Sequence, residues 1–199
     1  MTGKIMIGID EAGCGTLAGD FFMSIVALPE SATLPGVKDS KLLTDAKRED
    51  LVDSIWDAAV WHMTVDRPPW DIDKYGLGEV WRQEVCRLAT LCHRQFPDGT
   101  IILDGGRGVN LPWVKPVVKA DSKYLAVSAA SILAKYSQTC CMEAHDKRYP
   151  QYGFLAHKGY PTKDHLAALK EHGPCLIHRM SYKPVQRVLE ERKQMEFSM

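Results

Sequence analysis

With 199 residues, of which 45% are hydrophobic and 25% charged, the chain has the composition of one globular domain rather than of a disordered segment. It contains neither a signal-peptide core nor an apolar run of the ~18 residues that span a bilayer, so we expect a soluble, cytoplasmic protein without a membrane partner. The formal net charge of zero conceals an asymmetry: residues 1–104 contain 10 Lys and Arg against 17 Asp and Glu, and residues 105–199 contain 15 against 8. This distribution fits an acidic site beside a basic surface, and it fits solvated charged faces equally well.

Six cysteines are spread along the chain without a CxxC pair: Cys14, Cys86, Cys92, Cys140, Cys141 and Cys175. We expect them to be thiols, because a chain of this size needs no disulfides to fold. Cys175 with His172 and His178 lacks the second ligand pair of a structural zinc site.

The first half of the chain predicts three strands and one helix. The Ile-, Val- and Phe-rich residues 4–9 and 21–28 predict two strands that are joined by a glycine-rich loop. Residues 45–56 predict a helix with Thr44 as its N-cap, and residues 58–65 predict a third strand.

The second half predicts a helix over residues 78–96, a strand over 100–106 and a short strand over 117–121. From Ser122 onward, small and apolar residues at three- and four-residue spacing predict a long helix packed closely on a sheet. Loops and short helices should follow. The fold class is therefore α/β, with a mixed central sheet flanked by helices and a helical C-terminal part from about residue 160, in a single domain over residues 1–199.

Four acidic residues share one position in this pattern. Asp10, Glu11, Asp104 and Asp121 each lie near the C-terminal end of an apolar, strand-like run. Functional side chains collect at that edge of an α/β sheet, and four carboxylates that meet there repel one another unless cations neutralise them. Two Mg²⁺ or Mn²⁺ ions would satisfy oxygen ligands and could hydrolyse a phosphodiester. Each acid taken alone could instead cap a turn or a helix.

The chain resembles the type 2 ribonuclease H family, most closely the single-domain ribonuclease HII proteins. The resemblance extends over nearly the whole chain and rests on motifs that occur in the family's order: "GIDEAGCGTLAG", "KDSKLLTDAKREDL", "ILDG", "KADSKYLAVSAASILAK", "HKGYPTKDHL" and "HRMSYKPV". It implies a ribonuclease H-like fold. It also implies metal-dependent cleavage of RNA in RNA·DNA hybrids and at ribonucleotides embedded in duplex DNA, with 5′-phosphate and 3′-hydroxyl ends.

By motif position, the resemblance assigns the catalytic metal ligands to the same four acids, Asp10, Glu11, Asp104 and Asp121. It assigns substrate recognition to Tyr160, which would sense the 2′-hydroxyl, and to the glycine loop Gly13, Cys14 and Gly15. We expect phosphate contacts from the basic candidates Lys41, Lys123, Lys158, Lys163 and Arg179.

Three positions depart from the family pattern. The loop after the acid pair usually reads Gly-Arg-Gly, whereas Cys14 stands at its centre here, so a guanidinium that grips phosphate is lost. Asp20 stands where the family generally has proline, and Gln138-Thr139 stands where it often has Arg-Asp. The first departure bears on how strictly the protein cuts at single ribonucleotides.

Two other functions remain open at this stage. One is a catalytically inactive protein that binds RNA·DNA hybrids, and the other is a DNA-directed nuclease of the same superfamily, such as a junction resolvase. Tyr160 and the glycine loop argue against the second, because DNA has no 2′-hydroxyl to sense. We expect the protein to act as a monomer.

Overall fold

The computed structural model describes residues 4–37 and 43–197. It divides the chain into two compact units, which we call the sheet unit (Met1–Ala12, Phe22–Val65 and Trp81–Ser137) and the second unit (Gly13–Phe21, Asp66–Val80 and Gln138–Met199). Each unit is described by itself.

A mixed five-stranded sheet is the centre of the sheet unit. Its strands are β1 (Ile5–Ala12), β2 (Phe21–Pro29), β3 (Trp61–Arg67), β4 (Thr100–Asp104) and β5 (Val114–Val117), in the spatial order β3-β2-β1-β4-β5. β1 runs antiparallel to β2 and parallel to β4, and β4 runs parallel to β5. The C-terminal ends of β1, β4 and β5 therefore lie at one edge of the sheet, as the predicted α/β class requires.

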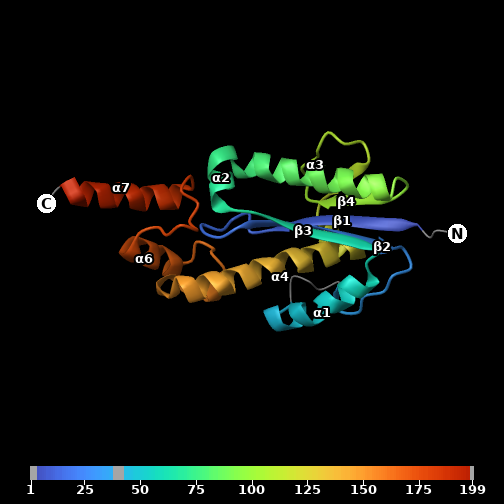
Figure 1. The fold of residues 1–199 in the computed structure, drawn as a ribbon, viewed down its shortest axis with the longest axis horizontal. Helices are drawn as coiled ribbons and strands as arrows, with labels where there is room; N and C mark the ends of the chain where they lie inside the picture. Colours follow the sequence, from blue (N-terminus) through green and yellow to red (C-terminus); the bar gives the residue numbers. More distant parts are fainter. Residues whose placement is uncertain (1–3, 38–42, 198–199) are drawn as a thin grey trace. The chain divides into compact units, whose positions relative to one another are not determined.

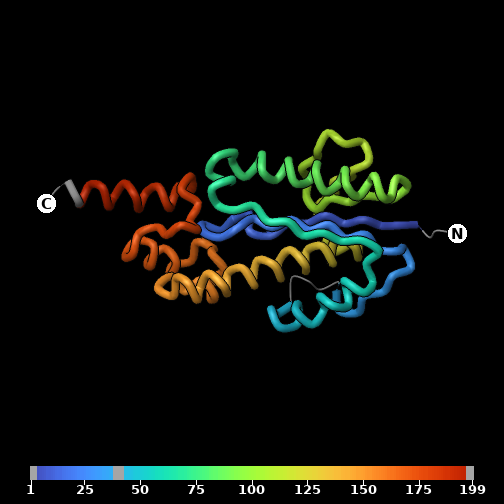
Figure 2. The backbone as a smooth tube through the Cα atoms, in the orientation of Figure 1, coloured from blue at the N-terminus to red at the C-terminus, as the bar shows by residue number. Residues whose placement is uncertain are grey.

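Helices cover both faces of this sheet (Figure 1). α3 (Leu77–Gln95) covers one face, and α1 (Asp45–Ala58) and α4 (Leu125–Arg148) cover the other. The backbone trace in Figure 2 shows the same three layers. Thr44 caps α1 as predicted, because its side chain accepts a hydrogen bond from the N–H of Lys47 at 3.3 Å.

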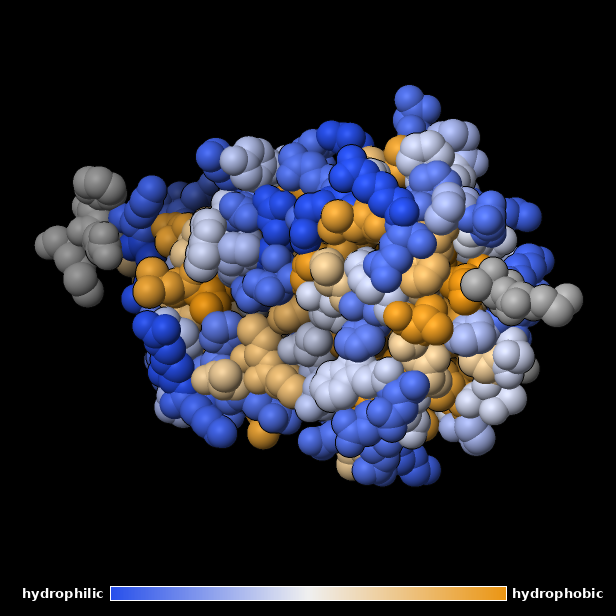
Figure 3. Space-filling model, turned by 45° about the vertical axis from the view of Figure 1, so that its right-hand side comes forward, coloured by the Kyte–Doolittle hydropathy of each residue, from blue (hydrophilic) through white to orange (hydrophobic). Residues whose placement is uncertain are grey.

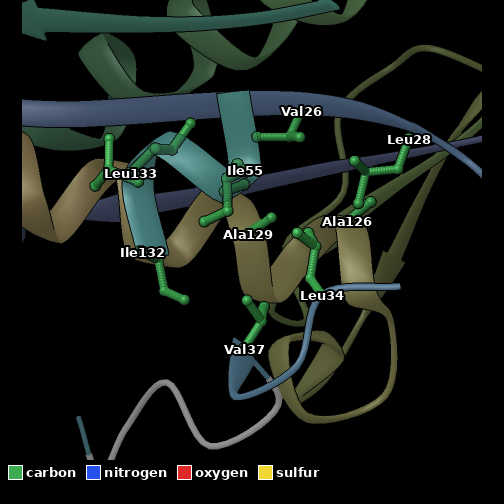
Figure 4. Packing of buried hydrophobic residues seen from close by; sticks show 11 residues of the cluster. Val26, Leu28, Leu34, Val37, Ile55, Ala126, Ala129, Ile132 and Leu133 are labelled. Carbon is green, nitrogen blue, oxygen red and sulfur yellow. The ribbon is translucent and has the colours of Figure 1, made fainter. Parts of the chain in front are cut away.

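The core between β2, α1 and α4 consists of interlocking aliphatic side chains (Figure 4). Val26 and Leu28 of β2 meet Ile55 of α1 and the alanine-rich face of α4. The approach is close because β1 has Gly8 opposite α4: a Cβ atom there would lie 2.2 Å from the backbone of Ala126 and Val127. Glycine at this position thus sets the distance between the sheet and the helix.

The second unit is mainly helical. Its elements are α2 (Pro69–Tyr75), the 3₁₀ turn η3 (Pro150–Tyr152), α5 (Phe154–His157), α6 (Lys163–His172) and α7 (Lys183–Phe197), together with the C-terminal part of α4. Val185 and Val188 of α7 are buried against Leu169 of α6 and Leu17. The C-terminal segment is therefore a docked helix rather than a free tail.

One predicted strand was misplaced and one helix was missed. The short strand placed over residues 117–121 is β5 at Val114–Val117, and Asp121 lies in the following 3₁₀ turn, η2 (Ala120–Ser122). The strand bends away at residue 118 because Lys119 adopts a left-handed backbone (φ 55°). α2 was not predicted, although Pro69 at its first turn is a regular helix start.

The surface offers no large apolar face in the view of Figure 3, where hydrophobic residues form small patches among hydrophilic ones. Among the described residues, no helix is both long and apolar enough to cross a membrane.

Candidate active site

The acid pair Asp10–Glu11 lies near the end of β1, and its two side chains have different surroundings. Successive residues of a strand point to opposite faces of a sheet. Glu11 accepts a hydrogen bond from Nε1 of Trp81 on α3 at 3.2 Å, whereas Asp10 lies near Ser131 of α4. The sequence predicted the pair but not Trp81 or Ser131, because no local pattern links them to β1.

The other two acids are joined through a backbone contact. Asp104 is the last residue of β4, and its Oδ1 accepts a hydrogen bond from the N–H of Ala120 at 2.6 Å. Asp121 follows Ala120 directly in η2, and its carbonyl accepts a hydrogen bond from the Ser128 hydroxyl of α4. Asp104 thus fixes the turn that holds Asp121.

The surroundings of Asp10 perturb its pKa. Burial, together with the charges of Glu11 and Asp104, raises the pKa of Asp10 to about 7. The side chain of Ser131 and the N–H of Glu11, which donates to Asp10 Oδ1 at 2.8 Å, act in the opposite direction. The structure therefore brings Asp10, Glu11 and Asp104 close enough for their charges to interact.

The donor set fits hard divalent cations. All four side chains offer carboxylate oxygens, the ligands that Mg²⁺ and Mn²⁺ prefer. A cation beside Asp10 would remove the repulsion that raises its pKa. Within the described part of the chain, no three of the four acids have ligand oxygens all within 4.8 Å of one another.

The glycine loop belongs to the second unit. Gly13 has a left-handed backbone (φ 84°), and a Cβ atom there would lie 2.8 Å from the carbonyl oxygen of Asp20, so no other residue fits without displacement. The side chain of Arg179 supports the loop from inside the unit. It donates hydrogen bonds to the carbonyls of Cys14 (3.3 Å) and Gly19 (3.0 and 3.2 Å).

Arg179 therefore differs from the phosphate contact that we expected. Its side chain is completely buried, and its N–H groups are engaged with the loop and with the hydroxyl of Tyr182 at 3.0 Å. A buried guanidinium with these partners positions the loop and is not available to a phosphate.

Tyr160, also in the second unit, presents its ring beside this loop. The side chain is 43% exposed, and a Cβ atom on Gly15 would lie 3.7 Å from Cε1 of the ring, an ordinary contact distance. The backbone is held more firmly, because the carbonyl of Tyr160 accepts from the N–H of Thr162 (2.8 Å) and from Nδ1 of His165 (2.9 Å). The structure thus brings together the predicted tyrosine and the predicted glycine loop.

Two histidines, His178 and His165, are hydrogen-bonded in sequence to the backbone carbonyl of Tyr160. Nδ1 of His178 accepts from the N–H of Cys175 at 3.0 Å, so the proton of neutral His178 is on Nε2, which lies 3.1 Å from Nε2 of His165. Nε2 of His165 therefore accepts a hydrogen bond from Nε2–H of His178, and Nδ1–H of His165 donates to the carbonyl of Tyr160. Burial lowers the pKa of both histidines to about 4, which keeps them neutral near pH 7. Sequence reasoning assigned no role to either histidine.

Apart from Arg179, the predicted basic contacts that the structure describes are exposed or half-buried. Lys123 and Lys163 are exposed, Lys158 is half-buried, and Nζ of Lys123 donates to the carbonyl of Val118 at 3.0 Å. Lys41 lies outside the described residues.

The chain is similar to known proteins over most of its length. The family model "Ribonuclease HII" matches residues 7–89 and 111–185. The ribonuclease HII of Francisella tularensis subsp. holarctica (strain FTNF002-00 / FTA) is 42% identical over 189 residues, which cover 94% of this chain and 100% of that protein.

Two solved structures show the same fold. The ribonuclease H2 from Pyrococcus horikoshii OT3 matches with a TM-score of 0.75 and 23% identity, covering 96% of this chain and 99% of that one. Bst-RNase HIII in complex with Mn²⁺ matches with a TM-score of 0.68 and 19% identity, covering 97% and 72%. On the evidence of the family model and the Francisella relative, the chain belongs to the ribonuclease HII family of type 2 ribonucleases H, divalent-metal-dependent endoribonucleases that cleave the RNA of RNA·DNA hybrids.

Proposed function

We propose that Asp10, Glu11, Asp104 and Asp121 hold two divalent ions, Mg²⁺ or Mn²⁺, and that the substrates include single ribonucleotides embedded in duplex DNA. The products would carry 5′-phosphate and 3′-hydroxyl ends. The observation that supports this proposal is the environment of Asp10, whose pKa is raised by burial and by two neighbouring carboxylates. Such crowding destabilises a metal-free site and favours cations in it.

When bound, two such ions activate a water molecule and neutralise the leaving oxygen of a phosphodiester. The chain's own contribution is orientation. Trp81 fixes one oxygen of Glu11, and the N–H of Ala120 fixes one oxygen of Asp104, before any substrate arrives. Ligands held in this way need little reorganisation during the reaction.

Recognition of the ribonucleotide would come from the second unit. Gly13 permits the left-handed turn of the loop, and the half-exposed ring of Tyr160, which lies beside Gly15, offers a stacking surface. Lys123, Lys158 and Lys163 would contact phosphates without reading sequence, so binding should weaken with added salt. Cys14 supplies no charge to the substrate, and we therefore expect the chain to cleave long hybrids as well as single ribonucleotides. We propose that it does so as a monomer.

One assay tests the metal-ligand roles. Labelled duplexes that are all DNA, contain one ribonucleotide, or contain a long RNA·DNA hybrid are incubated with the protein and Mg²⁺ or Mn²⁺. Wild type should cleave the two substrates that contain ribose and leave all-DNA duplex intact. Asp10→Asn and Asp104→Asn should abolish cleavage while retaining the fold and hybrid binding, and Asp50→Asn, an exposed acid on α1, serves as the matched control.

The alternatives appear as different outcomes of this assay. Cleavage of the all-DNA duplex would identify a DNA-directed nuclease. Hybrid binding without cleavage in wild type would identify an inactive binding protein. Undiminished cleavage by either acid variant would refute the assigned metal ligands.

Tyr160 is tested with a control of matched exposure. Tyr75 on α2 is 44% exposed, against 43% for Tyr160. Tyr160→Ala should slow cleavage at a single ribonucleotide by about tenfold or more, the value of one lost stacking contact, whereas Tyr75→Ala should not. Equal effects of the two substitutions would remove the recognition role.

A further inference from the structure

A second group of metal-ligand side chains lies in the second unit, apart from the four acids in sequence and in chemistry. Asp20, Cys141 and His145 each offer one ligand atom, and these atoms all lie within 4.8 Å of one another. Among the described residues this is the one group of three or more histidine, cysteine or acidic side chains that meets this distance. The Sγ atom of Cys141 lies 3.8 Å from Oδ2 of Asp20.

Local structure explains why the three side chains meet. Cys141 and His145 are four residues apart on α4, so they lie on the same side of the helix, one turn apart. Asp20 follows Gly19, whose carbonyl is held by the buried guanidinium of Arg179. The acid is therefore presented to α4 by a loop that is already fixed.

Burial and neighbouring charges disfavour the ionised forms of Asp20 and Cys141. Burial and the charge of Asp66 raise the pKa of Asp20 to about 6, although the charge of Arg179 acts in the opposite direction. Burial and the charges of Asp20 and Asp66 raise the pKa of Cys141 to about 12. Within the part of the chain that the structure describes, Nε2 of His145 is buried and has no hydrogen-bond partner. A cation would satisfy the acids and could occupy an unused lone pair of the imidazole.

We propose that Asp20, Cys141 and His145 bind a zinc ion. A donor set of one thiolate sulfur, one imidazole nitrogen and one carboxylate oxygen is typical of Zn²⁺, whereas Mg²⁺ takes oxygen ligands. In a tetrahedral zinc site, sulfur and oxygen ligands lie about 3.5 Å apart, close to the 3.8 Å seen between Cys141 and Asp20. Binding releases the thiol proton of Cys141 to solvent and leaves the fourth position to water.

The consequence is structural. Asp20 ends the segment that begins with the glycine loop, and its ligation would join that segment to α4 within the second unit. Zinc would thereby stabilise the loop independently of the Mg²⁺ or Mn²⁺ that the four acids are proposed to hold. Because the two donor sets share no residue, either proposal can fail without the other.

The test uses the full chain under reducing conditions with Co²⁺ and Zn²⁺ alone. Co²⁺ bound to a thiolate produces a near-ultraviolet charge-transfer band that carboxylate-bound Co²⁺ lacks, so the acid site does not interfere. Wild type should show this band, and Zn²⁺ should displace the cobalt and raise the unfolding temperature. Cys141→Ser should remove the band and weaken Zn²⁺ binding by at least about tenfold.

Cys140→Ser is the matched control, because Cys140 is the exposed neighbour on the same helix. It should retain the band and the affinity of wild type. His145→Asn, checked for folding by circular dichroism, provides a second variant and should also lose at least about tenfold in Zn²⁺ affinity. Absence of the band in wild type, or a band that persists in Cys141→Ser, would overturn the proposal.

Discussion

Replacing Gly8 by alanine is expected to force α4 away from β1. The added Cβ atom would lie 2.2 Å from the backbone carbon of Ala126 and the backbone nitrogen of Val127, so the helix would have to retreat by roughly 1 Å or more to reach normal contact. Backbone atoms cannot rotate out of the way as a flexible side chain can. Overpacking of this kind costs about 1–3 kcal/mol of unfolding free energy, and we expect the upper end.

The displacement should also reduce activity. α4 carries Ser131 beside Asp10, and the turn before α4 carries Asp121. A displacement of about 1 Å in catalytic groups slows an enzyme roughly 100-fold.

Urea denaturation and hybrid-cleavage rates measure the two effects, with Gly78→Ala as the control. Gly78 has open space around it and lies in the first turn of α3, where alanine should stabilise by up to about 1 kcal/mol. A Gly8→Ala protein with wild-type stability and rate would refute the close-approach argument.

Three further outcomes are expected. Burial lowers the pKa values of His165 and His178 to about 4, from an unfolded value near 6.5. The stability that each neutral form provides is complete above pH 6.5, and up to about 3 kcal/mol of it is lost for each histidine as the pH falls toward 4. The unfolding midpoints of wild type and His165→Gln should therefore converge at low pH, and parallel curves would contradict this. Thr162→Ala removes the N-cap of α6, which accepts from the N–H of His165 at 3.2 Å, and should lower the unfolding free energy by about 1 kcal/mol in thermal melts, whereas no change would mean that water replaces the cap. The lysine of Arg179→Lys cannot donate to two loop carbonyls at once, so this variant should lose about 2–3 kcal/mol of unfolding free energy and should also lose cleavage activity. A stable variant with normal cleavage would show that the loop keeps its conformation without the guanidinium.

The architecture could be predicted from the sequence where a local pattern carries it. The apolar run before Asp10 and the threonine before α1 gave correct element types, because strand and helix signals act over a few residues. The place of Asp121 in a turn could not be predicted, since a lysine gives no sequence signal for the left-handed backbone that Lys119 adopts after β5. The small residues of α4 predicted close packing, and Gly8 is the reason that the sheet permits it.

The acids of the candidate site could be predicted from the sequence, but the residues that form hydrogen bonds with them could not. Asp104 stands out beside glycines after an apolar strand, but its bond to the N–H of Ala120 joins residues 16 apart, and that of Trp81 to Glu11 joins residues 70 apart. The buried position of Arg179 is another case, because an arginine in sequence looks the same whether it contacts phosphate or supports a loop. Asp20 was visible as an unusual acid, yet its proximity to Cys141 depends on a contact across 121 residues.

The central claim is that the carboxylates of β1 and β4 bind divalent cations. Electron paramagnetic resonance of free Mn²⁺ tests it directly, in an Asp20→Asn background that removes the carboxylate ligand of the proposed zinc site. The protein with Asp10 and Asp104 intact should bind Mn²⁺, and Asp10→Asn or Asp104→Asn should weaken that binding by about tenfold or more while Asp50→Asn does not. Equal Mn²⁺ binding by all of these proteins would contradict the account.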